Sequence, residues 1–520
     1  MRLVALISGL LLCASGLAQN DSIPWSRLIA DPKKSDVEHL LLSNDTSLYM
    51  IRSRFTRFMG PEVPFIEKYR VGDFEQTYSK PLVMPVVNGR ETKFVTMAEL
   101  GGNLYLFVRY HHRGDARYRL YAQYITPQGD SKGRPILVDE ILLDEGRRTG
   151  HFKLAFSDDQ QQMALMYYPP LKRQKPQTFT LRLLDKELNT QWQQTLELPY
   201  MQETIALGRP VLDNKGNIFV PAEVTNLNRT WTARNPNYYN LVLGCFTKTS
   251  QVREFEVKLP SPKEQQQHRS ISNLKLQPAS NGNTIVAGLY SNLASTRTQS
   301  DGVFYLTINP DSARIERTAI LDFTQQIKRP FLSDKQLAKN RELEELILTD
   351  IVPQDNGAMV LVAEQQYRRQ RCTTDPRSGV VNCIDHFYFG DVLALQIEAD
   401  GKTISGVRIP KSQHSTNDDG PYASVAVSTK GKLPVFYFMD NQKNATGDPS
   451  ASPRSMQNIY SARLFRVTLN PGKDPEKTLL NSIDNGSVPV PKQQLDFSDG
   501  RILIYGAQKK GYRFAVFGGE

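Results

Sequence analysis

The stretch SNGNTIVAGLYSNLASTRTQSDGVFYLTINPDSA, Ser280–Ala313, contains the pattern from which the fold of the whole chain can be predicted. It begins with the polar turn SNGNT, passes through a short apolar segment and a long polar one, and reaches GVFYLTIN before a second turn, NPDSA. Short runs rich in Val, Ile, Tyr, Phe and Thr indicate strands, whereas clusters of Gly, Asn, Asp and Ser indicate turns. The repeating unit is therefore strand, tight turn, strand, long loop, strand, turn, strand.

The first of these two turns recurs along the chain. Similar turns begin at eight positions: Ser43, Leu100, Ser157, Asp213, Ser280, Pro353, Ser428 and Ser498. Their spacing of roughly 56 to 75 residues is in the range of propeller-like repeats. A four-stranded antiparallel unit cannot bury both of its faces alone, so such units must stack around an axis. The sequence predicts an all-β chain with one β-propeller domain over residues 19–520, built from eight four-stranded blades, with seven as the alternative count.

The last repeat is incomplete. From about Lys492 it contains QLDFS, RILIYGA and YRFAVFG, and then the sequence stops before a fourth strand. The segment IPWSRLIAD, Ile23–Asp31, resembles the fourth strands of other repeats. Pairing it with the last strand would leave no exposed sheet edge, so we expect the N-terminal strand to close the last blade.

The first 18 residues have the features of a secretory signal peptide. Arg2 is a short basic region, Leu3–Leu12 is apolar, and Ala18 ends a segment of small residues after which cleavage is expected. No other stretch approaches about 18 consecutive apolar residues, so the mature chain is not expected to span a membrane. We therefore expect an exported protein of the periplasm or the cell surface.

The formal net charge of +10 is spread along the chain, and it is not concentrated in a block. A dispersed basic excess is typical of a solvated surface and does not favour nucleic-acid binding. No nucleic-acid partner is expected, although anionic partners remain compatible with the charge.

One segment interrupts the strand pattern. FLSDKQLAKNRELEEL begins at Phe331, and Ser333 and Gln336 have the spacing of a capping box. A helical insertion over about residues 331–345 is predicted between two blades, either as a solvated linker or as a docking element on one rim.

Two cysteines bracket a polar loop in RCTTDPRSGVVNC, Arg371–Cys383. Zinc would need more ligands than Cys372, Cys383 and the nearby His386, and the spacing is not that of a Cys-x-x-Cys redox motif. Export favours an oxidised pair, so we predict a disulfide between Cys372 and Cys383 that closes a loop between the second and third strands of the sixth repeat. Neither a metal ion nor a cofactor is expected, and Cys245 is expected to be a buried, free thiol.

The sixth and seventh repeats resemble an uncharacterised family of exported Bacteroidetes proteins. The similar segments are NGAMVLVAEQQY, YFGDVLALQIEADGKTISGVRIPKSQHSTNDDGPYAS and VFYFMDNQKN, and the resemblance is clearest over Arg341–Asn444. It implies a β-propeller, export and a bacterial envelope location, and it implies no particular activity.

Polar side chains are concentrated at the strand ends of these two repeats: Lys411, Gln413, Asp440, Asn441, Lys443 and Asn444. They combine hydrogen-bond donors and acceptors, so they are the candidate binding residues. The same side chains could instead join the sixth blade to the seventh by hydrogen bonds to the backbone.

The motifs of zinc proteases, serine hydrolases, P-loop proteins and EF-hands are absent from the sequence, so no catalytic residue can be named. Variable long loops on a closed repeat scaffold favour a non-enzymatic binding or scaffold protein that engages an envelope protein or a glycan through its rim loops. The alternative is a carbohydrate-active lyase or hydrolase with converging carboxylates at the central funnel. The oligomeric state cannot be inferred from the sequence.

Overall fold

A computed structural model describes residues 23–31, 35–53, 55–56, 60–61, 64–111, 116–143, 150–170, 172, 174–225, 238–246, 251–257, 259, 269–292, 298–428, 433–445, 451–469, 474–480 and 486–518. The predicted signal peptide, residues 1–18, lies outside the described residues.

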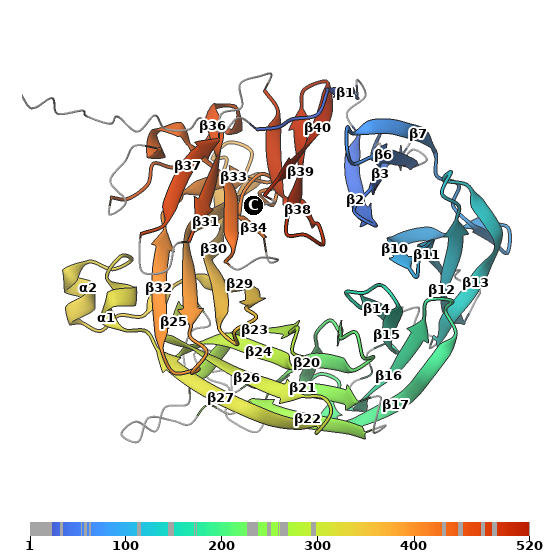
Figure 1. Ribbon diagram of the computed structural model, residues 1–520, viewed down its shortest axis with the longest axis horizontal. Coiled ribbons are helices and arrows are strands. Elements are labelled where there is room, and N and C mark those ends of the chain that lie inside the picture. The colour runs from blue at the N-terminus through green and yellow to red at the C-terminus, as the bar shows by residue number, and fades with distance from the viewer. Residues whose placement is uncertain are drawn as a thin grey trace, which may run out of the picture.

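The described residues form eight sheets with at least four antiparallel strands each, arranged around a common centre as in a β-propeller (Figure 1). Within each sheet the strands follow chain order, except that the last sheet takes one strand from the N-terminal part. The all-β class and the propeller arrangement predicted from the sequence are thereby confirmed.

The first four sheets cover the N-terminal half of the chain. Their strands are β2 (Asp36–Ser43), β3 (Ser47–Ser53), β6 (Phe65–Arg70) and β7 (Glu75–Pro81); β10 (Lys93–Leu100), β11 (Asn103–His111), β12 (Arg117–Ile125) and β13 (Ser131–Leu142); β14 (His151–Phe156), β15 (Gln162–Tyr168), β16 (Pro176–Asp185) and β17 (Thr190–Met201); and β18 (Ile205–Leu207) with β19 (Val211–Leu212), β20 (Ile218–Thr225), β21 (Tyr238–Phe246) and β22 (Gln251–Val257).

The other four sheets follow in the same way. Their strands are β23 (Ser270–Pro278), β24 (Thr284–Ser291), β26 (Gly302–Asn309) and β27 (Arg314–Asp322); β29 (Leu346–Pro353), β30 (Met359–Thr374), β31 (Val381–Ile397) and β32 (Ile404–Ile409), with β33 (Gln413–Thr416) beside β31; β34 (Ala426–Ser428), β35 (Val435–Asn441), β36 (Ala462–Thr468) and β37 (Glu476–Leu480); and β38 (Val488–Asp496), β39 (Ile502–Gln508), β40 (Gly511–Phe517) and β1 (Ile29–Ala30).

Short elements lie in the loops within the sheets and between them. The two-stranded pairs are β4 (Phe55–Thr56) with β5 (Gly60–Pro61), β8 (Val86–Val87) with β9 (Arg90–Glu91), and β25 (Gln299–Ser300) with β28 (Leu343–Glu344). The helices are α1 (Gln325–Lys328), α2 (Asp334–Ala338), η1 (Gln442–Asn444) and η2 (Ile459–Ser461).

The recurring turn that organises the sequence has one geometry in several sheets. Gly216, Gly282, Gly357 and Gly500 have φ angles of 86°, 85°, 84° and 88°. In each case the glycine amide donates to the carbonyl of the residue three positions earlier, as from Gly282 to Ala279 at 2.9 Å. Because a side chain is strained at this φ, glycine fixes the turn between the first and second strands.

The N-terminal segment lies along the last strand, where the sequence predicts a fourth strand. Ile29 is opposite Tyr512 and Ala30 is opposite Gly511 in the antiparallel register. The Ser26 amide donates to the Phe514 carbonyl at 2.8 Å. Strands from the two ends of the chain therefore share one sheet.

The apolar core is divided into clusters that lie between successive sheets. One cluster joins Leu289 and Val303 of the fifth sheet to Leu361 and Leu393 of the sixth. Another joins residues of β2, β3 and β6 to residues of β39 and β40, so the first and last sheets also pack together. Each sheet is thus buried by its neighbours and not by its own strands.

The predicted helix over about residues 331–345 is shorter than expected. The capping box of Ser333 and Gln336 is present, but α2 ends at Ala338. Asn340 adopts a φ of 47°, and the Arg341 amide donates to the Gln336 carbonyl at 3.0 Å. A left-handed asparagine after the last turn ends a helix, and residues 343–344 then pair as β28.

Candidate functional site

The second and third strands of the sixth sheet extend far beyond that sheet as a two-stranded arm. The first strand of the sheet pairs with β30 only as far as Gln365, yet β30 and β31 continue to pair out to Thr374 and Val381. Every residue from 368 to 384 is exposed. We call residues 366–389 the arm.

The predicted disulfide lies within the arm and not at the ends of a loop. Cys372 and Cys383 are directly opposite in the β30–β31 register, with Cα atoms 4.0 Å apart, and their sulfur atoms are bonded. The pairing prediction is confirmed, whereas the expected loop was too long, because strand continues on both sides of the disulfide. β-branched Thr373, Thr374 and Val381 favour extended backbone there.

One face of the arm carries a row of stacked rings from three strands. Tyr367 and Tyr388 stack with centroids 4.6 Å apart, and Tyr388 stacks on His414 of β33 at 4.7 Å. His386 Nδ1 lies 2.9 Å from His414 Nε2, so the two imidazoles share a hydrogen bond. Burial, followed by the charge of His386, lowers the pKa of His414.

Basic and apolar side chains complete the exposed arm. The guanidinium of Arg369 lies over the Tyr367 ring at 4.9 Å. Among the described residues, Arg371 and Arg377 have no ion-pair partner. Val380 in the turn and Val381 and Ile384 on β31 are 54%, 57% and 44% exposed, so three large apolar side chains are exposed within five residues of the arm.

The sequence-predicted residues Lys411 and Gln413 lie buried at the base of the arm. Lys411 Nζ is 2.5 Å from Glu364 Oε1 and donates to Gln413 Oε1 at 3.0 Å. Gln413 Nε2 donates to the Met439 carbonyl at 2.5 Å, and Ser424 Oγ donates to Glu364 Oε2 at 2.6 Å. These contacts join the sixth sheet to the seventh.

The remaining predicted residues lie on the seventh sheet beside this network. Asp440 is completely buried, its Oδ2 lies 3.2 Å from Lys477 Nζ, and Asn444 donates to its Oδ1 at 3.0 Å. Burial raises the pKa of Asp440 and lowers that of Lys477, with their mutual attraction opposing both shifts. Asn441 donates to the Ser455 carbonyl at 3.2 Å, and Lys443 is the one fully exposed member of the set.

The structure thus brings the six predicted residues together, and it gives most of them internal partners. The sequence prediction missed Glu364, the acidic partner of Lys411, because the two are far apart in the chain. It also missed the stacking of Tyr388 on Tyr367 and of His414 on Tyr388. Alternating aromatic residues in HFYF on β31 were the available signal for that row.

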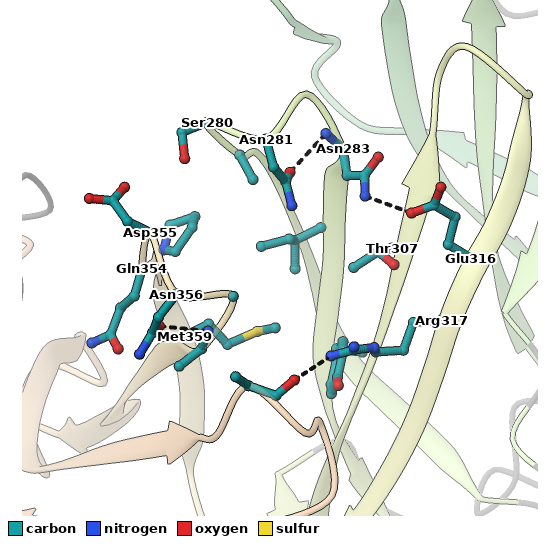
Figure 2. Close-up of a pocket in the computed structure, with 17 residues that line it drawn as sticks. Ser280, Asn281, Asn283, Thr307, Glu316, Arg317, Gln354, Asp355, Asn356 and Met359 are labelled. Atoms are coloured by element: carbon teal, nitrogen blue, oxygen red, sulfur yellow. Dashed lines mark hydrogen bonds between the residues drawn. The ribbon is translucent and has the colours of Figure 1, made fainter.

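A polar cavity of about 600 Å³ lies between the fifth and sixth sheets (Figure 2). It is lined by the turns that follow β23 and β29, together with residues of β26, β27 and the turn after β31. The turn after β29 lies at the end of the sixth sheet opposite to the arm, because β30 begins at this turn and ends in the arm. The cavity and the arm therefore belong to opposite rims.

Within the part of the chain that the structure describes, no helix is long and apolar enough to cross a membrane. The same described residues contain no group of three or more His, Cys, Asp and Glu side chains placed to hold a metal ion. Cys245 is a buried free thiol, and burial raises its pKa to about 12.

No family model and no curated protein matches the chain. Among solved structures it is similar to the polysaccharide lyase Uly1 at 11% identity and a TM-score of 0.37, over 84% of this chain and 94% of that one. It is similar to the WD40 domain of SCAP from fission yeast at 9% identity and a TM-score of 0.38, over 96% of this chain and 98% of that one. It is also similar to the β-propeller domain of the Trilobed protease from Pyrococcus furiosus, at 8% identity and a TM-score of 0.35, over 87% of this chain and 97% of that one.

Proposed function

We propose that this chain is an exported, non-enzymatic binding or scaffold protein of the bacterial envelope, which engages a protein or a glycan through its rim and above all through the arm. The observation that carries the proposal is that every residue from 368 to 384 is exposed, on a disulfide-closed strand pair. The N-terminal sequence and the resemblance to exported Bacteroidetes proteins are the grounds for the compartment.

The scaffold in this proposal is a closed ring of eight blades. Its support is the set of eight larger sheets, the pairing of β1 with β40, and the apolar cluster between the first and last sheets. A ring of this kind keeps the base of each rim loop rigid, so a loop can bind without losing much conformational entropy.

The arm has the composition of a binding surface. Apolar side chains such as Val381 and Ile384 offer area to bury, and Arg371 and Arg377 offer unpaired guanidinium groups for acidic groups on the partner. Aromatic and arginine residues dominate the energetics of many interfaces. The partner is therefore expected to present acidic groups beside an apolar contact.

The predicted residues at the arm base have a supporting role in this proposal. Lys411, Gln413 and Glu364 hold β33 and the start of the seventh sheet against the root of the arm. A rigid root is what allows an exposed hairpin to present its side chains in one orientation.

Affinity capture with and without the arm tests this proposal. Arg369 and His386 face each other in the register, so residues 370–385 can be replaced by Asn-Gly, a preferred two-residue hairpin turn. We expect the intact chain, but not the shortened chain, to retain a reproducible component from a bacterial envelope extract, with both chains melting at similar temperatures. Protease or periodate treatment of the retained material then identifies it as protein or glycan.

The paired substitution Arg371→Glu with Arg377→Glu is the charge test. It should weaken retention at least tenfold at low salt, because both guanidinium groups would become carboxylates that repel an acidic partner. Equal retention by the intact, shortened and charge-reversed chains would contradict the proposal.

A further inference from the structure

The cavity between the fifth and sixth sheets is separate from the arm, and its chemistry differs from that of the arm. Its volume of about 600 Å³ lies within the roughly 300–1,000 Å³ that small-ligand sites occupy. Figure 2 shows Asn281 and Asn283 on one side, Gln354 and Asn356 on another, and Arg317 near the strands below.

The floor of the cavity is apolar and fixed. Ile285, Tyr305 and Met359 contribute to its lining, and they are only 5%, 0% and 3% exposed. Because these side chains are packed in the core cluster between the two sheets, the floor does not need to rearrange when a ligand enters.

Several polar groups around the floor are held in place by internal hydrogen bonds. Asn283 donates to Glu316 at 2.8 Å, and Arg317 donates to the Ala399 carbonyl at 2.9 Å. The Oδ1 atoms of Asn281 and Asn356 accept the amides of Asn283 and Ala358 at 3.0 and 2.9 Å.

These hydrogen bonds engage only the Oδ1 atoms of the Asn281 and Asn356 side chains. Among the described residues, the Nδ2 groups of Asn281 and Asn356 have no hydrogen-bond partner, although both side chains are oriented through Oδ1. Each Nδ2 group is therefore a pre-oriented donor at the wall of the cavity.

The lining of the cavity carries two acidic side chains and one basic side chain. Glu316 and Asp355 are acidic and Arg317 is basic, so the lining disfavours a strongly anionic ligand and provides no cluster of carboxylates for a cation. Hydroxyl groups both donate and accept, so they match a wall of amides, carboxylates and one guanidinium.

We propose that this cavity binds a short segment of neutral saccharide, with Asn281 and Asn356 donating to its hydroxyl groups. The site goes beyond the proposed function, because it lies on the rim opposite to the arm. Failure of one proposal leaves the other unaffected.

Calorimetric titration with maltotriose, cellotriose, xylotriose, mannotriose and N,N′,N″-triacetylchitotriose, using the full chain, tests the proposal. We expect measurable binding of at least one of these neutral trisaccharides. The double substitution Asn281→Asp with Asn356→Asp keeps both turn acceptors and removes both free donors, so it should weaken that binding at least tenfold.

Asn214→Asp is the matched control, because Asn214 occupies the equivalent turn of the fourth sheet and is exposed outside the cavity. It should leave saccharide affinity within twofold of the unmodified chain, and all variants should melt at similar temperatures. Absence of binding by all five sugars at millimolar concentration, or equal affinity of the double variant, would overturn the proposal. Tighter binding of trigalacturonate than of every neutral sugar would contradict the neutral class.

Discussion

At the scale of single residues, a buried charge network joins the two ends of the chain. Arg52 of β3 contacts Asp31 at 2.9 Å and Glu67 of β6 at 2.5 Å. Glu67 is completely buried and also accepts hydrogen bonds from Tyr69 at 2.5 Å and from Tyr512 of β40 at 2.8 Å. The first and last sheets therefore share one carboxylate.

Removing the cation from this network should be costly. Arg52→Met leaves Glu67 and Asp31 buried without their guanidinium, and the free energy of unfolding should fall by about 3–5 kcal/mol. Arg70→Met is the control, because Arg70 is 61% exposed in its pairs with Asp73 and Glu75, and water screens such exposed pairs, so its loss should change the stability far less than the loss of Arg52. Unfolding in guanidinium chloride measures the free energy of unfolding of both variants. Equal decreases in the two variants would argue against the role given to the network.

The same network gives a dependence of stability on pH. Burial opposes ionisation of Glu67, but hydrogen bonds from Arg52 and Tyr69 outweigh it, so the pKa of Glu67 lies below its ordinary value. A carboxyl whose pKa is lower in the folded state stabilises the fold above its unfolded pKa, about 4.3, and loses that contribution as the pH falls through the folded value. The melting temperature should therefore fall below about pH 4 more steeply in the unmodified chain than in Glu67→Gln.

At the scale of elements, the outer part of the arm, residues 371–384, is a hairpin that pairs only with itself, since β33 pairs with β31 only from His386 onwards. Isolated two-stranded hairpins are marginally stable in water, so the Cys372–Cys383 bond is expected to keep the outer strands paired. The closed loop is short, and its bond contributes on the order of 2–3 kcal/mol to the arm.

Cys372→Ser with Cys383→Ser should therefore loosen the arm and leave the sheets intact. Hydrogen exchange of amides in residues 370–385 should accelerate, because the arm opens locally. The melting temperature of the whole chain should change by less than about 2 °C, since the arm's outer residues lie outside the core clusters. Unchanged exchange in the arm would show that the strands pair without the disulfide.

At the scale of the whole molecule, each sheet depends on both of its neighbours. The segment before β2 contributes Ile23 and Trp25 to the apolar cluster between the seventh and eighth sheets, in addition to pairing with β40. Trp25 packs against Gly506, where any larger side chain would collide with the indole. The N-terminal segment is therefore part of the core.

Deleting residues 23–34 from a chain that otherwise begins at Ile23 should weaken the entire fold. Loss of Ile23 and Trp25 costs about 1.5–3 kcal/mol for each buried side chain, and the edge of β40 becomes exposed. We expect a clearly lower melting temperature and faster proteolysis in β38–β40. A truncated chain as stable as the control would show that the first strand is dispensable.

Features that depend on neighbouring residues in the chain could be predicted from the sequence. The turn glycines, the alternation of strand residues and the incomplete last repeat predicted four-stranded units with the last one completed from the N-terminus. They could do so because turns and strand faces are set by neighbours in the chain. The capping box at Ser333 was predicted for the same reason.

Contacts between residues of different repeats could be identified only in the folded structure. It paired Lys411 with Glu364, placed Glu67 against Tyr512, and brought the turns of Asn281 and Asn356 to the wall of one cavity. It also continued β30 and β31 past the disulfide, where a loop was expected. Such contacts join side chains of different sheets, so they arise from the stacking of blades, and no local pattern in one repeat encodes its neighbour's side chains.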